Sequence, residues 1–149
     1  CSSDLIFTRE EMLNEEVIRC RNAKKFEERY LRKEFADQVS VIRILDSRKE
    51  EFRLSKAYEN KIDVINVITA PEIEMLIIHN EGEYEHFKRS GKKPSEFCKV
   101  NLRMHNVKSY EFVKDYFSNP QTLVEAIKEY RRTANVPNGE YCLSDLLKQ

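Results

Sequence analysis

Charged side chains that could do chemistry follow two apolar segments of the chain, at the point where each segment ends. Asp46 and Arg48 follow VSVIRIL, while Glu72 and Glu74 follow DVINVIT. In open α/β sheets, ligands bind beyond the carboxyl ends of the strands. Carboxylates there suit Mg²⁺ or Mn²⁺, which prefer oxygen ligands, and such an ion could activate water and neutralise a phosphodiester. The pattern predicts Asp46 and Glu74 as metal ligands and catalytic acids, with Glu72 as a third ligand.

The same acids also have a purely structural interpretation. Glu72 and Glu74 fall in the first turn of a helix, where the macrodipole favours negative charge, and Asp46 suits an ordinary turn. Glu74 stands out because the segment IEMLIIH is apolar nearly all round the helix, which predicts that Glu74 is partly buried. A buried carboxylate needs a partner, either an arginine such as Arg43 or Arg48, or a metal ion.

The elements that would position these side chains can be predicted from periodicity and punctuation. The Thr8–Glu11 segment has the form of a capping box, which predicts a long helix running to about Ala36. Runs rich in β-branched residues predict strands over 39–45 and 63–69, and a short edge strand over 51–55.

A helix is expected to begin near Pro71, and after Gly82 the chain is expected to be helical only. The predicted fold class is α/β, a small and mostly parallel sheet with a helical C-terminal third. It forms one domain, with the α/β core over about 1–80 and the helical part over about 81–149.

Composition bounds the class of protein. Of 149 residues, 40% are hydrophobic and 35% are charged, a composition typical of a compact, helix-rich domain. With only three Gly, the chain cannot form a Walker or Rossmann phosphate loop. The formal net charge is zero, so only a local patch could attract nucleic acid. No apolar run is long enough for a bilayer, so we expect no membrane contact and a cytoplasmic location.

The cysteines indicate reduced thiols rather than a zinc site or a disulfide framework, because their spacing suits neither. They are Cys1, Cys20, Cys98 and Cys142. The initial Cys1 fits either a trimmed chain end or the lipidated cysteine of a processed lipoprotein.

A basic patch over residues 88–108 is the candidate nucleic-acid interface. Its cations outnumber its single acid, Glu96, and aromatic residues nearby could stack on bases. The cations are Lys88, Arg89, Lys92, Lys93, Lys99, Arg103 and Lys108, and the aromatic residues are Phe87, Phe97, Tyr110 and Tyr116. We expect Arg48, Lys88, Arg89, Lys92 and Lys93 to hold phosphate, and Ser95 to begin a helix beside them. Alternatively, the basic patch is an ordinary solvated surface whose positive charge is balanced by the acids that precede it in the sequence.

The segment Thr69-Ala70-Pro71-Glu72-Ile73-Glu74, followed by MLIIH, resembles the motif of RloB-like (AbiL-type), Toprim-related proteins. On that resemblance Pro71, Ile73, Glu74 and His79 occupy family positions, and Asp46 in VIRILDSR matches the metal-binding acid. The resemblance implies a Toprim-type fold and a metal-dependent act on nucleic acid. It also implies a setting in phage defence or restriction beside an ATPase partner. Arg48 replaces the second acid of the usual Asp-x-Asp motif, and the early Glu of Toprim domains has no counterpart.

These features are consistent with two functions. The first is a Toprim-like accessory protein of a phage-defence, restriction or mobile-element system that binds or acts on nucleic acid with Mg²⁺ or Mn²⁺. Whether it is an enzyme, such as a metal-dependent nuclease or another phosphodiester-acting enzyme, stays open. The alternative is a non-catalytic protein–protein interaction domain that uses its C-terminal helices, with Tyr116 and Phe117 on the partner surface.

Overall fold

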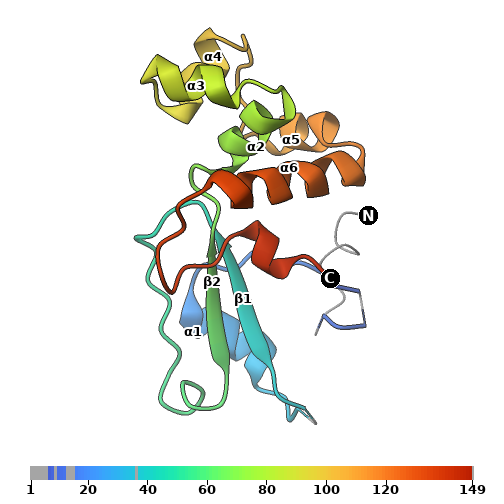
Figure 1. Ribbon diagram of the computed structural model, residues 1–149. Coiled ribbons are helices and arrows are strands. Elements are labelled where there is room, and N and C mark those ends of the chain that lie inside the picture. Colours follow the sequence, from blue (N-terminus) through green and yellow to red (C-terminus); the bar gives the residue numbers. More distant parts are fainter. Residues whose placement is uncertain (1–6, 9, 13–15, 36, 149) are drawn as a thin grey trace.

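The chain forms a small α/β part that carries a cap of helices (Figure 1). The computed structural model describes residues 7–8, 10–12, 16–35 and 37–148. Cys1, whose role as a chain end was left open, lies outside the described residues. Within those residues, no helix is both long enough and apolar enough to cross a membrane.

The two strongest predicted strands are present and parallel. Strands β1 (Ser40–Leu45) and β2 (Asp63–Ile68) pair in register from Ser40 opposite Asp63 to Leu45 opposite Ile68. In the described part of the chain these two strands make the whole sheet, extended only by an isolated parallel bridge between Val67 and Tyr141. The α/β class and the parallel pairing are thus confirmed, while the Toprim-like character stays a prediction.

The connection between the strands contains no edge strand, so the prediction for 51–55 is wrong. The Ser55 amide donates to the carboxylate of Glu27 rather than to a neighbouring strand. Phe52 packs edge-on against Phe26, with ring centroids 5.8 Å apart, and Leu54 is buried. Packing against the N-terminal helix therefore replaces strand pairing in this segment.

The N-terminal helix is much shorter than the predicted 8–36. Helix α1 (Ala23–Phe26) continues only as a single π-helical turn, η2 (Glu27–Leu31). Glu11 does accept from the Thr8 amide at 2.6 Å, as a capping box requires, but residues 10–12 and 16–20 are not helical. The helix begins instead where Asn22 accepts from the Lys25 amide at 2.9 Å. Positions 9, 13–15 and 36 of the predicted helix lie outside the described residues.

Helices after β2 confirm the predicted helical C-terminal part. They are α2 (Glu72–Asn80), α3 (Tyr84–Ser90), α4 (Pro94–Val100), α5 (Tyr110–Tyr116), α6 (Pro120–Thr133) and the 3₁₀ turn η3 (Leu143–Leu146). Helix α2 is central among them, and its side chains Leu76, Ile77 and Ile78 are fully buried with Phe97 of α4 and Ile127 of α6. An all-round apolar helix must be covered on every side, and α4 and α6 provide that cover.

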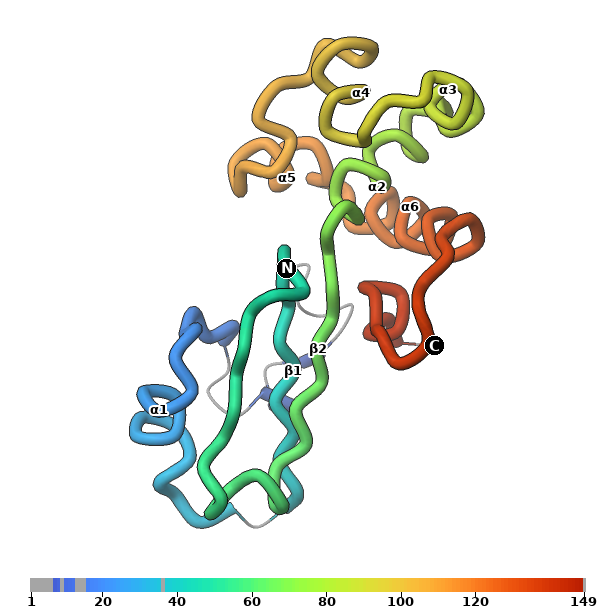
Figure 2. Tube along the Cα trace, turned by 90° about the vertical axis from the view of Figure 1, so that its left-hand side faces the viewer, coloured from blue at the N-terminus to red at the C-terminus, as the bar shows by residue number. Residues whose placement is uncertain are grey.

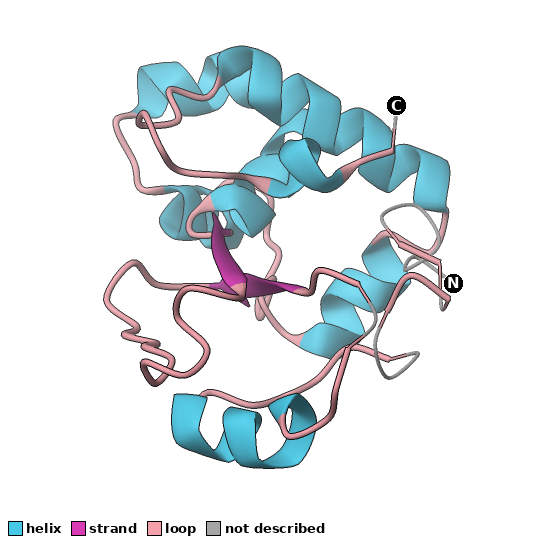
Figure 3. Cartoon of the chain, turned by 90° about the horizontal axis from the view of Figure 1, so that it is seen from below, coloured by secondary structure: helices cyan, strands magenta, loops and turns pink. Residues whose placement is uncertain are grey.

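The chain returns to the sheet after α6. Figure 2 shows the two strands between α1 on one side and the C-terminal segment on the other, and Figure 3 shows the strands from below with helices around them. The Ile68 amide donates to the Tyr141 carbonyl at 2.9 Å, which fixes this segment beside the end of β2. Helix α2 begins just beyond that point, after Pro71, so its first turn meets the returning C-terminal segment.

Candidate functional site

Glu74 is a buried carboxylate with one oxygen left without a partner. Its exposed fraction is 2%, as its place in the central helix α2 predicts. Oε1 lies 3.1 Å from Nζ of Lys108. Oε2 is buried and has no hydrogen-bond partner among the described residues. The predicted burial of Glu74 is confirmed, but its partner is Lys108 rather than either of the predicted arginines.

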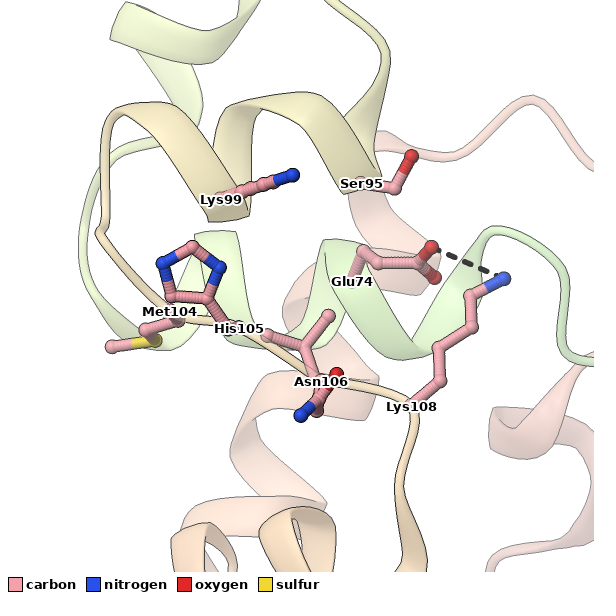
Figure 4. A pocket seen from close by; sticks show the side chains of 8 residues that line it. Glu74, Ser95, Lys99, Met104, His105, Asn106 and Lys108 are labelled. Carbon is pink, nitrogen blue, oxygen red and sulfur yellow. Dashed lines mark ion pairs between the residues drawn. The ribbon is translucent and has the colours of Figure 1, made fainter.

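A pocket of about 310 Å³ opens over Glu74 (Figure 4). Its walls come from α4 and from the loop that follows it, and Glu74 is the only acid in its lining. The lining residues are Glu74, Ser95, Lys99, Met104, His105, Asn106, Val107 and Lys108. Ser95 and Lys99 lie on one side of Glu74, while His105, Asn106 and Lys108 lie on the other (Figure 4). The pocket thus combines one carboxylate at its base with several basic side chains around it.

The loop after α4 holds Lys108 over Glu74 through a defined backbone path. The Met104 amide donates to the Cys98 carbonyl at 2.9 Å, which ties the loop to the end of α4. Arg103 and Asn106 adopt left-handed conformations, with φ of 56° and 57°, and reverse the chain. Val107 is buried in the core next to Lys108. These constraints place the ammonium group beside a carboxylate that lies far away in the sequence.

Glu72 lies in a different environment from Glu74. Successive helical residues are about 100° apart around the axis, so positions two apart face nearly opposite sides. Glu72 is fully buried, and both of its oxygens lie 3.3 Å from the Leu143 amide of the C-terminal segment. Burial raises the pKa of Glu72 to about 7, and the Leu143 hydrogen bond opposes that rise only in part. The interpretation of Glu72 as a solvated first-turn charge is therefore wrong.

Asp46 and Arg48 lie at the exposed end of β1, as the sequence predicts. Arg48 makes a two-pronged ion pair with Glu140, with Nε–Oε1 and Nη2–Oε2 distances of 2.8 Å each. This pair raises the pKa of Arg48 and lowers the pKa of Glu140. Arg48 thus holds the C-terminal segment, and its predicted contact with phosphate would have to compete with Glu140.

Arg43, the other arginine predicted beside Glu74, belongs to the sheet. Its guanidinium lies 4.5 Å from the centre of the Phe52 ring and donates to Asn66 Oδ1 at 3.2 Å. A carboxylate oxygen of Glu50 lies 3.6 Å away. Desolvation by burial lowers the pKa of Arg43, and Glu50 opposes this effect. These neighbours account for a cation on the buried face of a strand.

The predicted metal ligands do not meet in one cluster. Across residues 7–8, 10–12, 16–35 and 37–148, no group of three or more His, Cys, Asp or Glu side chains could hold a metal ion. Glu74 offers a single free oxygen with an ammonium group beside it, and Glu72 already accepts from Leu143. These residues do not by themselves fit a divalent ion, and the Mg²⁺ or Mn²⁺ site stays a prediction.

Two cations of the predicted basic patch, Lys99 and Lys108, line this pocket. Lys88 and Arg89 are exposed in the last turn of α3, and Lys93 is exposed just before Pro94. Lys92 donates to Asn101 Oδ1 at 2.8 Å. Helix α4 begins at Pro94, one residue before the expected Ser95, and Ser95 lies in the pocket wall.

The aromatic residues proposed for base stacking mostly belong to the core. Phe97 is fully buried and Phe87 packs against it, with ring centroids 5.4 Å apart. Tyr116 donates to Glu81 and accepts from Asn80. Tyr110 alone of the four is exposed, at 69%. The prediction that Phe97 stacks on bases is wrong, because the ring has no free face.

His79, which the family resemblance singled out, closes α2 inside the helical cap. Its ring stacks on Tyr84 at a centroid distance of 4.5 Å, and Nε2 lies 2.9 Å from Thr133 Oγ1. Burial lowers the pKa of His79, which favours the neutral ring. These contacts explain the residue structurally, as a link between α2, α3 and α6.

Sequence reasoning found the acid of the pocket but missed its partner. The sequence places Lys108 in the basic patch, and nothing local in the sequence links it to Glu74. Comparison of the chain with known proteins matches no family model, no curated protein and no solved structure. The RloB-like resemblance therefore stays a prediction, and the site must be judged by its geometry.

Proposed function

We propose that the protein binds single-stranded nucleic acid through the Glu74 pocket and the cations around it. The observation that carries this proposal is the pocket itself, an open cavity with lysines at its sides and a carboxylate at its base. Lysine ammonium groups are point charges that hold phosphate. The zero net charge of the chain means that attraction to a polyanion must come from such a local cluster.

Lys99 is the clearest phosphate contact. It projects from the last turn of α4 into the pocket region and is exposed. Lys108 also faces the pocket, although part of its charge is used by Glu74, and its side chain is 57% exposed. Lys88, Arg89 and Lys93, on and just after α3, are further exposed cations that phosphate groups could contact. A flexible backbone could follow these cations while one nucleotide enters the cavity.

The biological setting rests on the sequence resemblance alone. We propose a Toprim-like accessory protein of a phage-defence, restriction or mobile-element system, beside an ATPase or another protein partner. Catalysis on a phosphodiester would extend this function and would require Mg²⁺ or Mn²⁺ ligands beyond the side chains around Glu74. No step of the binding function needs that ion.

The alternative, an interaction domain that uses the C-terminal helices, has little aromatic surface to work with. Phe117 is buried in the helical core, and Tyr116 is held by Glu81 and Asn80. Tyr110 on α5 is the exposed aromatic side chain of that segment. The pocket is therefore the better supported site.

The test is the salt dependence of binding to a labelled single-stranded oligonucleotide, measured by fluorescence anisotropy between about 50 and about 200 mM salt. Each phosphate contact on a single strand contributes about 0.7 to the slope of log K against log salt. We expect Lys99→Ala to weaken binding and to reduce the slope by about 0.7. Lys56→Ala, an exposed lysine in the connection between the strands, is the matched control and should leave both unchanged.

Two results would overturn the proposal. One is an absence of binding by the wild-type protein at the lowest salt. The other is a Lys99→Ala variant whose affinity and slope equal those of the Lys56→Ala control.

A further inference from the structure

We infer that the Glu74 pocket selects a nucleobase that carries an exocyclic amino group and disfavours uracil or thymine. The inference rests on the proposed function and names the ligand of the same site. It starts from Glu74 Oε2, which is buried and without a partner among the described residues, in a side chain that lines the pocket.

The ligand must bring a hydrogen-bond donor to this oxygen. An ionised carboxylate can only accept hydrogen bonds, and a buried polar atom without a bond is costly. The opposite oxygen is already used, because Oε1 lies 3.1 Å from the Lys108 ammonium. A ligand N–H at Oε2 would satisfy the remaining acceptor without displacing Lys108.

The charges around the pocket favour a neutral donor over a cation. Lys99 and Lys108 both line the cavity, and Glu74 is the only acid in the lining. A guanidinium, an ammonium or a divalent ion at Oε2 would approach two positive side chains against a single negative one. A base amino group avoids this repulsion, because the base is neutral and its own phosphate is attracted by the lysines.

The other walls suit a flat heterocycle. Met104 and Val107 present apolar atoms, and the exposed ring of His105 offers a surface on which a base can stack. Ser95 and Asn106 add a hydroxyl and an amide to the lining (Figure 4). The cavity volume of about 310 Å³ lies at the lower end of the range for small-ligand sites.

The discrimination follows from the base edges. Cytosine carries an N4 amino donor at the position where thymine carries the O4 acceptor. A carboxylate facing O4 would place two acceptors together, whereas a carboxylate facing N4 accepts a hydrogen bond. One such contact is expected to favour cytosine over thymine by about tenfold in affinity.

The experiment compares short oligo-dC and oligo-dT of equal length, and hence of equal charge, by fluorescence anisotropy above neutral pH. We expect the wild-type protein to bind oligo-dC about tenfold more tightly, with equal salt slopes for both. An oligonucleotide of N4,N4-dimethylcytosine removes the donor without touching the protein, and it should bind like oligo-dT. The Glu74→Gln variant should lose the preference, provided that its thermal melt shows a folded protein.

The outcomes separate this inference from the proposed function. Equal affinity for oligo-dC, oligo-dT and the dimethylated strand would overturn the base selection, although nucleic-acid binding would stand. Tight binding by the dimethylated strand, equal to that of oligo-dC, would also overturn it. No binding of any strand would overturn the proposed function together with the inference.

Discussion

Glu72→Gln tests whether the returning C-terminal segment truly covers the first turn of α2. Glu72 is fully buried, and the Leu143 amide is its hydrogen-bond donor. Gln retains an acceptor for Leu143 and nearly the same shape, so it imitates the protonated acid. The variant therefore removes the ionisation of this side chain while leaving the packing in place.

The magnitude follows from the raised pKa of Glu72, about 7 compared with 4.5 for the free side chain. Burial is the largest cause; Asp145 adds to the rise, whereas the Leu143 hydrogen bond and Arg131 oppose it. Between these two pKa values the unfolded chain has lost the proton that the folded chain retains. The free energy of unfolding therefore falls as pH rises through this window, by about 1.4 kcal/mol per pH unit.

The full loss would be roughly 3 kcal/mol by pH 7. The dipole of α2 favours the ionised form by about 0.3–1 kcal/mol, which reduces this loss of stability. We therefore expect a loss of about 2–3 kcal/mol. The contribution is complete below the unfolded pKa of 4.5 and is lost as pH passes the folded value of about 7.

The assay is urea unfolding of both proteins at about pH 5 and about pH 8. The measured quantity is the stability of Glu72→Gln minus that of the wild type, because subtraction removes other titrating groups such as His79. We expect this difference to grow in favour of the variant by about 2–3 kcal/mol between the two pH values. Glu85→Gln, an exposed acid in the first turn of α3, is the control and should give a constant difference.

A difference that stays flat for Glu72→Gln would refute the reasoning. Glu72 would then be hydrated in the folded protein, and the contact between α2 and Leu143 would not form as described. A difference that favours the wild type at high pH would refute it as well, because it would indicate a favourable buried charge.

Two further predictions concern the end of β1 and the metal. Arg48→Ala should lower the free energy of unfolding in urea by at most about 1 kcal/mol, because its ion pair with Glu140 is exposed, and by less at high salt. Arg53→Ala, at another exposed arginine, is the control. An equal loss of stability in both variants would contradict a role for the ion pair. A thermal melt with Mg²⁺ or Mn²⁺ tests the metal site predicted from the sequence, for which the described lining of the Glu74 pocket supplies one acid. A bound ion at a hundredfold excess over Kd would add about 2.7 kcal/mol. A shift lost in both Asp46→Asn and Glu74→Gln would establish that site, whereas an unchanged midpoint would contradict it.

Local sequence patterns were sufficient to predict the central elements. The β-branched runs before Asp46 and before Thr69 form β1 and β2, because such side chains suit a pleated, half-buried surface. The apolar segment after Pro71 became the central helix, and the burial of Glu74 followed from its place within that segment. In each of these cases the residues that decide the outcome are neighbours in the sequence.

The errors arose where distant contacts decide the structure. The N-terminal helix spans only residues 23–31, the segment whose Phe26 and Leu31 pack on the sheet connection at Phe52 and Leu54. Glu72 is buried by a segment that returns from beyond α6, and its sequence context gives no sign of that cover. Lys108 reaches Glu74 only because the loop after α4 reverses at two left-handed residues.

The contrast between the two acids of α2 supports the choice of Glu74 as the functional one. Both are buried, so burial alone does not distinguish a site from a structural contact. Glu72 has its hydrogen-bond donor in the Leu143 amide, and it lies against the returning C-terminal segment. Glu74 lines the pocket and keeps one buried oxygen without a partner among the described residues, while Lys108 lies beside its other oxygen. Replacing a structural acid by Gln should leave ligand binding unchanged, whereas replacing an acid that accepts a hydrogen bond from the ligand should alter binding. Glu72→Gln should therefore leave nucleic-acid binding and the preference for oligo-dC intact, while Glu74→Gln should lose that preference.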